Sequence, residues 1–193
     1  MIRCRFFLLL FFLHFLLSGC QQDENCIALA GHNDQARYCL LPTAQAPVLN
    51  LTQEVQIDWK GQTFTLLSVL ESGTNATTMV TLTPTGQTLF SVRQDAQKVA
   101  LNPAAPLPSG FEPRALLALV QLALWPEEKL RAHLTGCLRL EASATHRTLR
   151  CDDAALLDVS YLGRPESYRL QWYAAPLNLQ ATWLPDVKDD ASE

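Results

Sequence analysis

The stretch LTQEVQIDWKGQTFTLLSVL, residues 51–70, decides the fold class of this chain. Val55, Ile57 and Trp59 alternate with polar residues, and a period of two is typical of a strand with one buried and one solvated face. Lys60 and Gly61 interrupt the pattern before a second apolar run begins. The stretch therefore predicts an antiparallel hairpin whose apolar face is turned toward the core.

Further short strands are expected on both sides of the middle of the chain. Each is a short run of alternating residues bounded by Gly, Pro, Asn or Asp. The runs cover residues 78–83, 87–93 and 98–101 before the middle, and residues 157–161, 168–172 and 177–183 after it. This spacing is typical of an antiparallel meander, so the sequence predicts a mainly β (α+β) fold.

The middle of the chain contains the strongest helical signal. Pro113 suits the first position of a helix, and Pro126 ends it after Trp125. Residues 115–124 are apolar almost all round, and such a helix must be covered on several sides. A second short helix is expected from Pro126 to Gly136. The order strands, helices, strands therefore predicts a curved antiparallel sheet wrapped round the helical insertion.

Residues 1–19 have the three parts of an export signal. Arg3 and Arg5 are followed by an apolar stretch that only His14 interrupts, and it is shorter than the ~20 apolar residues of a spanning helix. The closing Leu17-Ser18-Gly19-Cys20 resembles the lipobox of bacterial lipoproteins, in which cleavage leaves a lipidated cysteine as the first residue. The alternative is an ordinary secretory signal that happens to end in a cysteine.

The lipobox divides the chain into a signal (1–19), a lipidated tether with a disulfide-pinned lead-in (20–47), a main domain (48–185) and an acidic tail (186–193). Removing the signal leaves 174 of the 193 residues, enough for one domain with a real core. The net charge becomes −6, because the signal contains two of the 15 basic residues and none of the 19 acidic ones. An acidic body argues against nucleic acid as a partner.

Four cysteines remain for pairing once Cys4 is removed and Cys20 is acylated. An even number of cysteines in an oxidising compartment predicts disulfides. Three pairings are possible, and the sequence favours Cys26–Cys39 with Cys137–Cys151, because the second pair closes a hairpin that turns at residues 142–145. The alternative is a zinc site of four thiolates, although no Cys-x-x-Cys motif is present.

Catalytic motifs are sparse, and no enzyme activity, metal or cofactor is expected. His32, His133 and His146 lie in different expected elements, and Asp152-Asp153 suits a solvated turn better than an acid pair. The sequence contains no nucleophile elbow and no phosphate-binding glycine loop. A thioesterase-like hydrolase is a further hypothesis. It requires an activity that is lost when Ser68, Ser91 or His146 is replaced.

The lipobox, the strand meander, the helices around Leu124-Trp125-Pro126 and the closing strands resemble the outer-membrane receptor that accepts lipoproteins from a periplasmic carrier. They are similar also to a group of small lipoproteins related to that receptor and often encoded beside aryl polyene synthesis genes. This resemblance, over residues 49–184, implies an unclosed half-barrel with a helical lid over an apolar cavity. It places Pro84-Thr85-Gly86 where the receptor has a Pro-Leu-Gly hairpin that enters the membrane. Gln21 stands where an aspartate would retain the protein in the inner membrane, so the resemblance implies the outer membrane.

Large apolar side chains are the positive functional signal. Some of them are expected to line a lipid-sized pocket, and the alternative is that all of them form an ordinary core. The candidates are Trp59, Phe64, Leu66, Phe90, Leu116, Leu119, Val120, Trp125, Tyr161, Leu170, Trp172, Leu179 and Trp183.

The sequence thus predicts a lipoprotein on the periplasmic face of the outer membrane that binds a lipid, an acyl chain or a polyene lipid and aids its placement there. The helix at 113–124 would act as the lid, and a periplasmic carrier protein is a possible partner. The second hypothesis is a non-enzymatic interaction module that docks a membrane or assembly partner.

Overall fold

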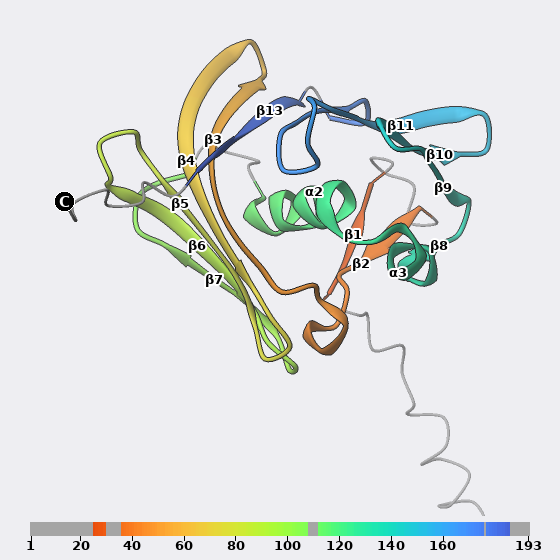
Figure 1. Ribbon diagram of the computed structural model, residues 1–193, viewed down its shortest axis with the longest axis horizontal. Coiled ribbons are helices and arrows are strands. Elements are labelled where there is room, and N and C mark those ends of the chain that lie inside the picture. The colour runs from red at the N-terminus through yellow and green to blue at the C-terminus, as the bar shows by residue number, and fades with distance from the viewer. Residues whose placement is uncertain (1–24, 30–35, 108–111, 176, 186–193) are drawn as a thin grey trace, which may run out of the picture.

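Ten antiparallel strands form one curved sheet that does not close on itself (Figure 1). The computed structural model describes residues 25–29, 36–107, 112–175 and 177–185. In the sheet the order is β7-β6-β5-β4-β3-β13-β12-β11-β10-β9. The strands are β3 (Leu49–Trp59), β4 (Gln62–Ser72), β5 (Thr77–Leu82), β6 (Thr88–Gln94), β7 (Val99–Pro103), β9 (Leu138–Ala142), β10 (His146–Cys151), β11 (Ala154–Tyr161), β12 (Tyr168–Trp172) and β13 (Leu177–Leu184). The expected mainly β fold with an unclosed antiparallel sheet is confirmed.

The hairpin β3–β4 has the faces that its sequence predicts. Val55, Ile57 and Trp59 are buried, while the residues between them are exposed. Lys60 and Gly61 have φ angles of 51° and 78°, which is the backbone of a tight two-residue hairpin turn. Glycine suits such a turn because a residue with a Cβ is strained at positive φ.

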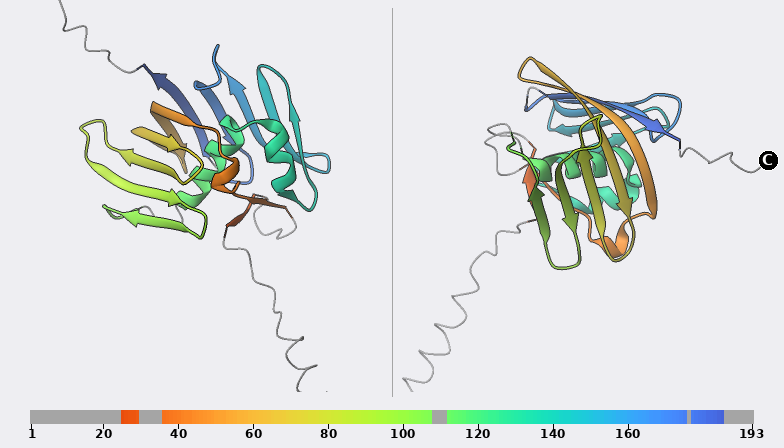
Figure 2. Two further views of the ribbon diagram at one scale, coloured as in Figure 1. Left: turned by 60° about the horizontal axis from the view of Figure 1, so that its bottom comes forward. Right: turned by 90° about the vertical axis from the view of Figure 1, so that its left-hand side faces the viewer.

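Helix α2 (Pro113–Leu124) runs along the concave side of the sheet (Figures 1 and 2). The Glu112 side chain accepts a hydrogen bond from the backbone N–H of Arg114 and caps the start of the helix. Every residue from 115 to 123 is buried, as the all-round apolar pattern predicts. The helix is thus an inner layer of the core, and the fold does not show a lid. Helix α3 (Glu127–Leu130) and the 3-10 turn η2 (Arg131–His133) follow it.

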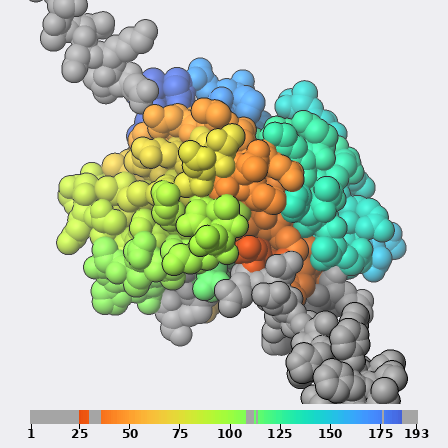
Figure 3. Space-filling model, turned by 90° about the horizontal axis from the view of Figure 1, so that it is seen from below, coloured from red at the N-terminus to blue at the C-terminus, as the bar shows by residue number. Residues whose placement is uncertain are grey.

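The lead-in is more ordered than its polar sequence suggests. We expected a loop-like segment, but β1 (Cys26–Ala28) and β2 (Arg37–Cys39) form a small sheet with β8 (Leu134–Thr135). A 3-10 turn, η1 (Thr43–Gln45), leads on to β3. In the space-filling view, orange atoms of the segment that begins at residue 36 lie between the yellow and green strands and the teal part of the chain that follows α2 (Figure 3). Its few apolar side chains are buried in the main core because they pack against α2.

The favoured disulfides, Cys26–Cys39 and Cys137–Cys151, are confirmed. They use all four thiols that the zinc alternative would need. The hairpin β9–β10 pairs Leu140 with Leu149 and Leu138 with Cys151. The expected hairpin places the two cysteines opposite each other, so the observed register differs from it by one residue.

Several parts of the sequence prediction lie outside the described residues, namely the signal (1–19), the lipidation site Cys20, Gln21, His32 and the acidic tail (186–193). In the part of the chain that the structure describes, no helix has the length and apolar character needed to cross a membrane.

Removing either disulfide is expected to lower stability by about 3 kcal/mol, since each bond closes a loop of 13 or 14 residues. For a domain of this size that is a fall in Tm of roughly 6–12 °C. Calorimetry on the double variants C26S/C39S and C137S/C151S measures it. A variant with an unchanged Tm would show that its disulfide is absent from the folded protein.

Candidate ligand-binding site

Of three hollows with largely apolar linings in the described part of the chain, the largest lies at the end of β3, and we call it the Trp59 pocket. It has a volume of about 220 Å³, and the described residues that line it are all apolar or aromatic. Three strands and the segment after β7 supply the lining, which consists of Ile57, Trp59, Phe64, Leu66, Leu89, Phe90, Pro106 and Leu107. Such a wall favours an apolar guest over a polar one, because a buried polar group would lose its hydrogen bonds with water.

A second hollow of about 110 Å³ lies on the other side of Trp59, between α2 and β12–β13. Its walls include Leu116 and Leu119 of the helix and Trp172 of the sheet. Trp59 lines both hollows, so the two adjoin at this residue. The Lys60 ammonium lies 4.5 Å from the centre of the Trp59 ring.

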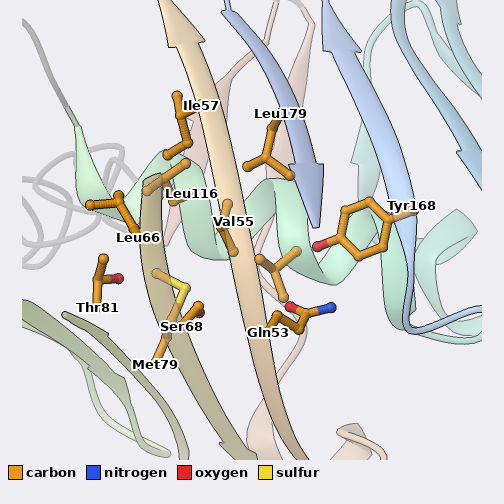
Figure 4. Close-up of a pocket in the computed structure, with 11 residues that line it drawn as sticks. Gln53, Val55, Ile57, Leu66, Ser68, Met79, Thr81, Leu116, Tyr168 and Leu179 are labelled. Atoms are coloured by element: carbon orange, nitrogen blue, oxygen red, sulfur yellow. The ribbon is translucent and has the colours of Figure 1, made fainter. Parts of the chain in front are cut away.

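A third hollow lies between α2 and β3–β5 and has a volume of about 20 Å³, close to the room of one water molecule (Figure 4). Figure 4 shows the Tyr168 hydroxyl directed into this space beside Val55. Burial raises the pKa of Tyr168, so the hydroxyl keeps its proton. Gln53, another polar lining residue, donates a hydrogen bond of 2.6 Å to the backbone oxygen of Glu166.

Nine of the thirteen candidate cavity residues line these hollows. They are Trp59, Phe64, Leu66, Phe90, Leu116, Leu119, Val120, Trp172 and Leu179. The other four do not. Trp125 is fully buried, Tyr161 and Trp183 pack at the margin of the core, and Leu170 lines a hollow on the outer face.

Sequence reasoning missed four residues of the Trp59 pocket, namely Ile57, Leu89, Pro106 and Leu107. Ile57 was expected only to face the core. Leu89 comes directly before the inward-facing Phe90, so strict alternation would turn it outward. The pairing of β5 with β6 has a register shift at Thr81 and Leu82, opposite Leu89, and this interrupts the alternation. Pro106 and Leu107 belong to a Pro-rich segment that reads as an ordinary loop. The leucine within that segment is the one signal that could have pointed to the pocket.

A buried polar network holds the last turn of α2. The Oε1 atom of Gln121 accepts hydrogen bonds from the Tyr38 hydroxyl at 2.8 Å and from the Leu41 N–H at 3.0 Å. Its Nε2 atom donates to Oε1 of Gln94 at 3.0 Å, and Gln94 donates in turn to the Leu41 carbonyl at 2.7 Å. The network joins the helix to the lead-in and to β6, and every member of it gains a partner.

The carbonyl groups at the end of α2 are also bound. Nη1 of Arg147 donates to the backbone oxygens of Leu122 and Trp125, at 2.9 and 2.8 Å. The Tyr161 hydroxyl donates to the Ala123 oxygen at 2.7 Å. Helix ends leave such carbonyls without partners inside the helix, so these bonds attach α2 to β10 and β11.

One hydrogen-bonded chain on the outer face resembles a catalytic triad. Nδ1 of His146 lies 3.1 Å from the Ser160 hydroxyl, and its Nε2 lies 3.2 Å from the Asp158 carboxylate. However, β10 and β11 each pair with strands on both sides, so their N–H groups are used in the sheet and none is directed to an oxyanion site. Ser68 is buried on the inner face, away from this cluster.

Asp158 also binds other groups of the same face. Partial burial by itself would raise the pKa of Asp158, but hydrogen bonds from Thr148, Tyr173 and His146 outweigh it and hold that pKa below its ordinary value. The carboxylate is thus an anchor for neighbouring side chains. Asp152 and Asp153 form an exposed turn between β10 and β11, as the sequence predicted.

Pro84, Thr85 and Gly86 form the turn between β5 and β6, which is the hairpin after the third strand of the large sheet. All three residues are exposed. The backbone N–H of Gly86 donates to the Thr83 oxygen at 2.9 Å, and Gly86 has a φ angle of 85°. The turn is thus closed by its own backbone, and Thr85 at its tip offers little apolar area.

A family profile described as "Protein of unknown function (DUF3261)" matches residues 50–184. The match begins within β3 and ends with β13, so it covers the ten-stranded sheet and α2 and leaves out the lead-in. No curated protein matches the chain. Since the profile covers well over half of the sequence, the chain belongs to the DUF3261 family.

Proposed function

We propose that this protein is a lipid-anchored lipoprotein of the outer membrane that shelters one apolar chain in the Trp59 pocket and helps to place it in the membrane. The observation that supports this most is the entirely apolar lining of that pocket. The adjoining hollows share Trp59, Ile57 and Leu116 with one another, so the apolar surface continues along the N-terminal half of α2.

The volume of the pocket limits the ligand. Sites for drug-sized ligands usually measure about 300–1,000 Å³, and an apolar cavity of about 150 Å³ already accepts benzene. A pocket of about 220 Å³ therefore suits the end of an acyl or polyene chain rather than a whole lipid. To hold a longer chain, the Trp59 side chain would have to turn aside so that the Trp59 pocket joins the hollow of about 110 Å³.

We expect α2 to stay in place while the ligand binds. The hydrogen bonds of Gln121, Arg147 and Tyr161 oppose movement of the helix as a lid. The wall formed by Pro106 and Leu107 belongs to no helix or strand, so it can be displaced at a lower cost. The ligand would thus enter beside Leu107.

Lipidation at Cys20 would keep this body close to the membrane. Only four residues lie between Cys20 and Asn25, so this stretch of five Cα–Cα steps spans at most about 18 Å. Two or three acyl chains anchor a protein stably, because each buried methylene contributes about 0.8 kcal/mol.

Leu107→Glu is expected to weaken the binding of cis-parinaric acid, a fluorescent polyene fatty acid, at least about tenfold, because it places a charge in an apolar wall. Leu107 is only partly buried, so the fold should survive. The measurement is a fluorescence titration of the chain secreted with a cleavable signal in place of residues 1–20.

The control is Leu162→Glu, the same change at an exposed leucine. It should bind as the wild type does. A wild type that ignores the fatty acid and carries no lipid in mass spectrometry after purification would refute the proposal.

The second candidate function is a non-enzymatic interaction module. The buried helix α2 fills much of the concave side of the sheet, and a filled core favours this function over ligand binding. In that case the protein should capture a defined membrane or assembly partner, and L107E should leave the capture unchanged. Crosslinking of the anchored protein in cells followed by mass spectrometry distinguishes the two functions.

A further inference from the structure

The outer face of the back half of the sheet carries two polar rows that cross five adjacent strands. The strand registers pair each residue of a row with its neighbour on the next strand. The first row consists of Gln56, Gln180, Arg169, Ser160 and His146, on β3, β13, β12, β11 and β10 in that order. The second row consists of Asp58, Asn178, Gln171, Asp158 and Thr148 on the same strands. We call the two rows together the polar platform.

A hollow of about 390 Å³ lies on the polar platform and is the largest of the four described. Eight side chains of the platform line it, together with Leu170 and Leu179. Its volume lies within the range of about 300–1,000 Å³ that is typical of ligand sites. Five strands at ~4.8 Å spacing make the rows about 19 Å long, which suits an extended chain rather than a single small molecule.

The chemistry of the platform points to a hydroxyl-rich ligand without charge. Four of its ten side chains are amides, and an amide both donates and accepts, as a ligand hydroxyl does. The charged members are Asp58, Asp158 and Arg169, so the platform carries both signs of charge. An anion would meet two carboxylates, and a cation would meet the guanidinium.

Several side chains of the platform are already oriented. Nε of Arg169 donates to Oε1 of Gln180 at 2.9 Å, and the Tyr173 hydroxyl donates to Asp158 at 2.7 Å. The Tyr173 side chain is 49% exposed, so its ring offers an apolar face beside the second row. An aromatic ring next to fixed polar groups suits the alternating apolar and hydroxyl faces of a sugar.

The outer surface of the sheet at β4 and β5 is less polar. The outward positions of β4 and β5 include Leu67, Val69, Val80 and Leu82, which pair across these two strands. A polar outer face is therefore not a general property of this sheet. The amides and charges are concentrated on the strands that form the hollow.

We propose that the polar platform binds a neutral oligosaccharide that lies across the strands. This site is separate from the Trp59 pocket and lies on the opposite face of the sheet. A body held close to a bacterial membrane by its tether would then contact a glycan at the same time as an apolar chain.

The test uses the full mature lipidated protein in micelles of a detergent without a sugar headgroup. Isothermal titration with chitotriose, maltotriose and cellotriose should show binding of at least one of them, with a Kd of about 0.1–1 mM. The double variant Q171A/N178A should weaken that binding at least about tenfold, because it removes two amides of the second row.

The matched control is Q87A/N102A, the same two amide truncations at exposed positions beside β6 and on β7, away from the platform, which should leave the Kd within about twofold. L107E should also leave it unchanged, so a failure here is distinguishable from a failure of the fatty-acid site. No binding of any of the three sugars, tighter binding of trigalacturonic acid, or equal loss in Q87A/N102A would each overturn the proposal.

Discussion

Replacing Gln121 by leucine should destabilise the protein by about 3–6 kcal/mol, although the side chain keeps nearly the same volume. The change leaves the Tyr38 hydroxyl, the Leu41 N–H and Oε1 of Gln94 without their Gln121 partner, and all of them are buried. Each unsatisfied buried group costs about 1–3 kcal/mol. Total stability of a domain is about 5–15 kcal/mol, so this one change removes a large part of it. Urea unfolding followed by circular dichroism measures the effect.

Two further variants make this result specific. Tyr38→Phe removes one donor and should cost only about 1 kcal/mol, because the Gln121 oxygen keeps its bond from the Leu41 N–H. Gln97→Leu changes an exposed turn and should stay within about 0.5 kcal/mol of the wild type. If Q121L lost no more stability than Q97L, the polar network would not hold α2 in solution.

Replacing Phe90 by alanine should have opposite effects on stability and on ligand binding. Phe90 is 1% exposed and lines the Trp59 pocket. Truncating a buried phenylalanine usually costs about 3–5 kcal/mol and leaves a cavity. The cavity enlarges the pocket, so a bound chain can restore part of the lost contact. Saturating cis-parinaric acid should thus raise the Tm of F90A by more than it raises that of the wild type.

The control for this experiment is Leu149→Ala. Leu149 is also 1% exposed, and it lines none of the three interior hollows. Its loss should cost about 2–5 kcal/mol without changing the response to the ligand. Equal shifts in F90A and L149A would place the fatty acid somewhere other than the Trp59 pocket.

The sequence predicted only some of the residues that line the Trp59 pocket. Trp59 and Phe90 were expected to line a pocket and do so, whereas Trp125, equally large and apolar, is fully buried and lines none of the hollows. Size and hydropathy say that a side chain avoids water, but they do not say whether a neighbour fills the space beside it. That depends on α2, whose position is set by bonds such as Tyr38 to Gln121 across 83 residues of sequence.

The sequence by itself predicted the strands of the large sheet, the central helix and the favoured disulfide pairs, because each follows from a local pattern. Alternation in residues 54–59, Pro113 and Pro126 at the ends of a helix, and cysteines 14 residues apart all act over short distances. The tertiary structure alone decided that β13 pairs with β3, that the lead-in packs against α2, and that two polar rows align across five strands. These are long-range pairings, and their register is fixed by packing of whole faces, which no single segment of sequence contains.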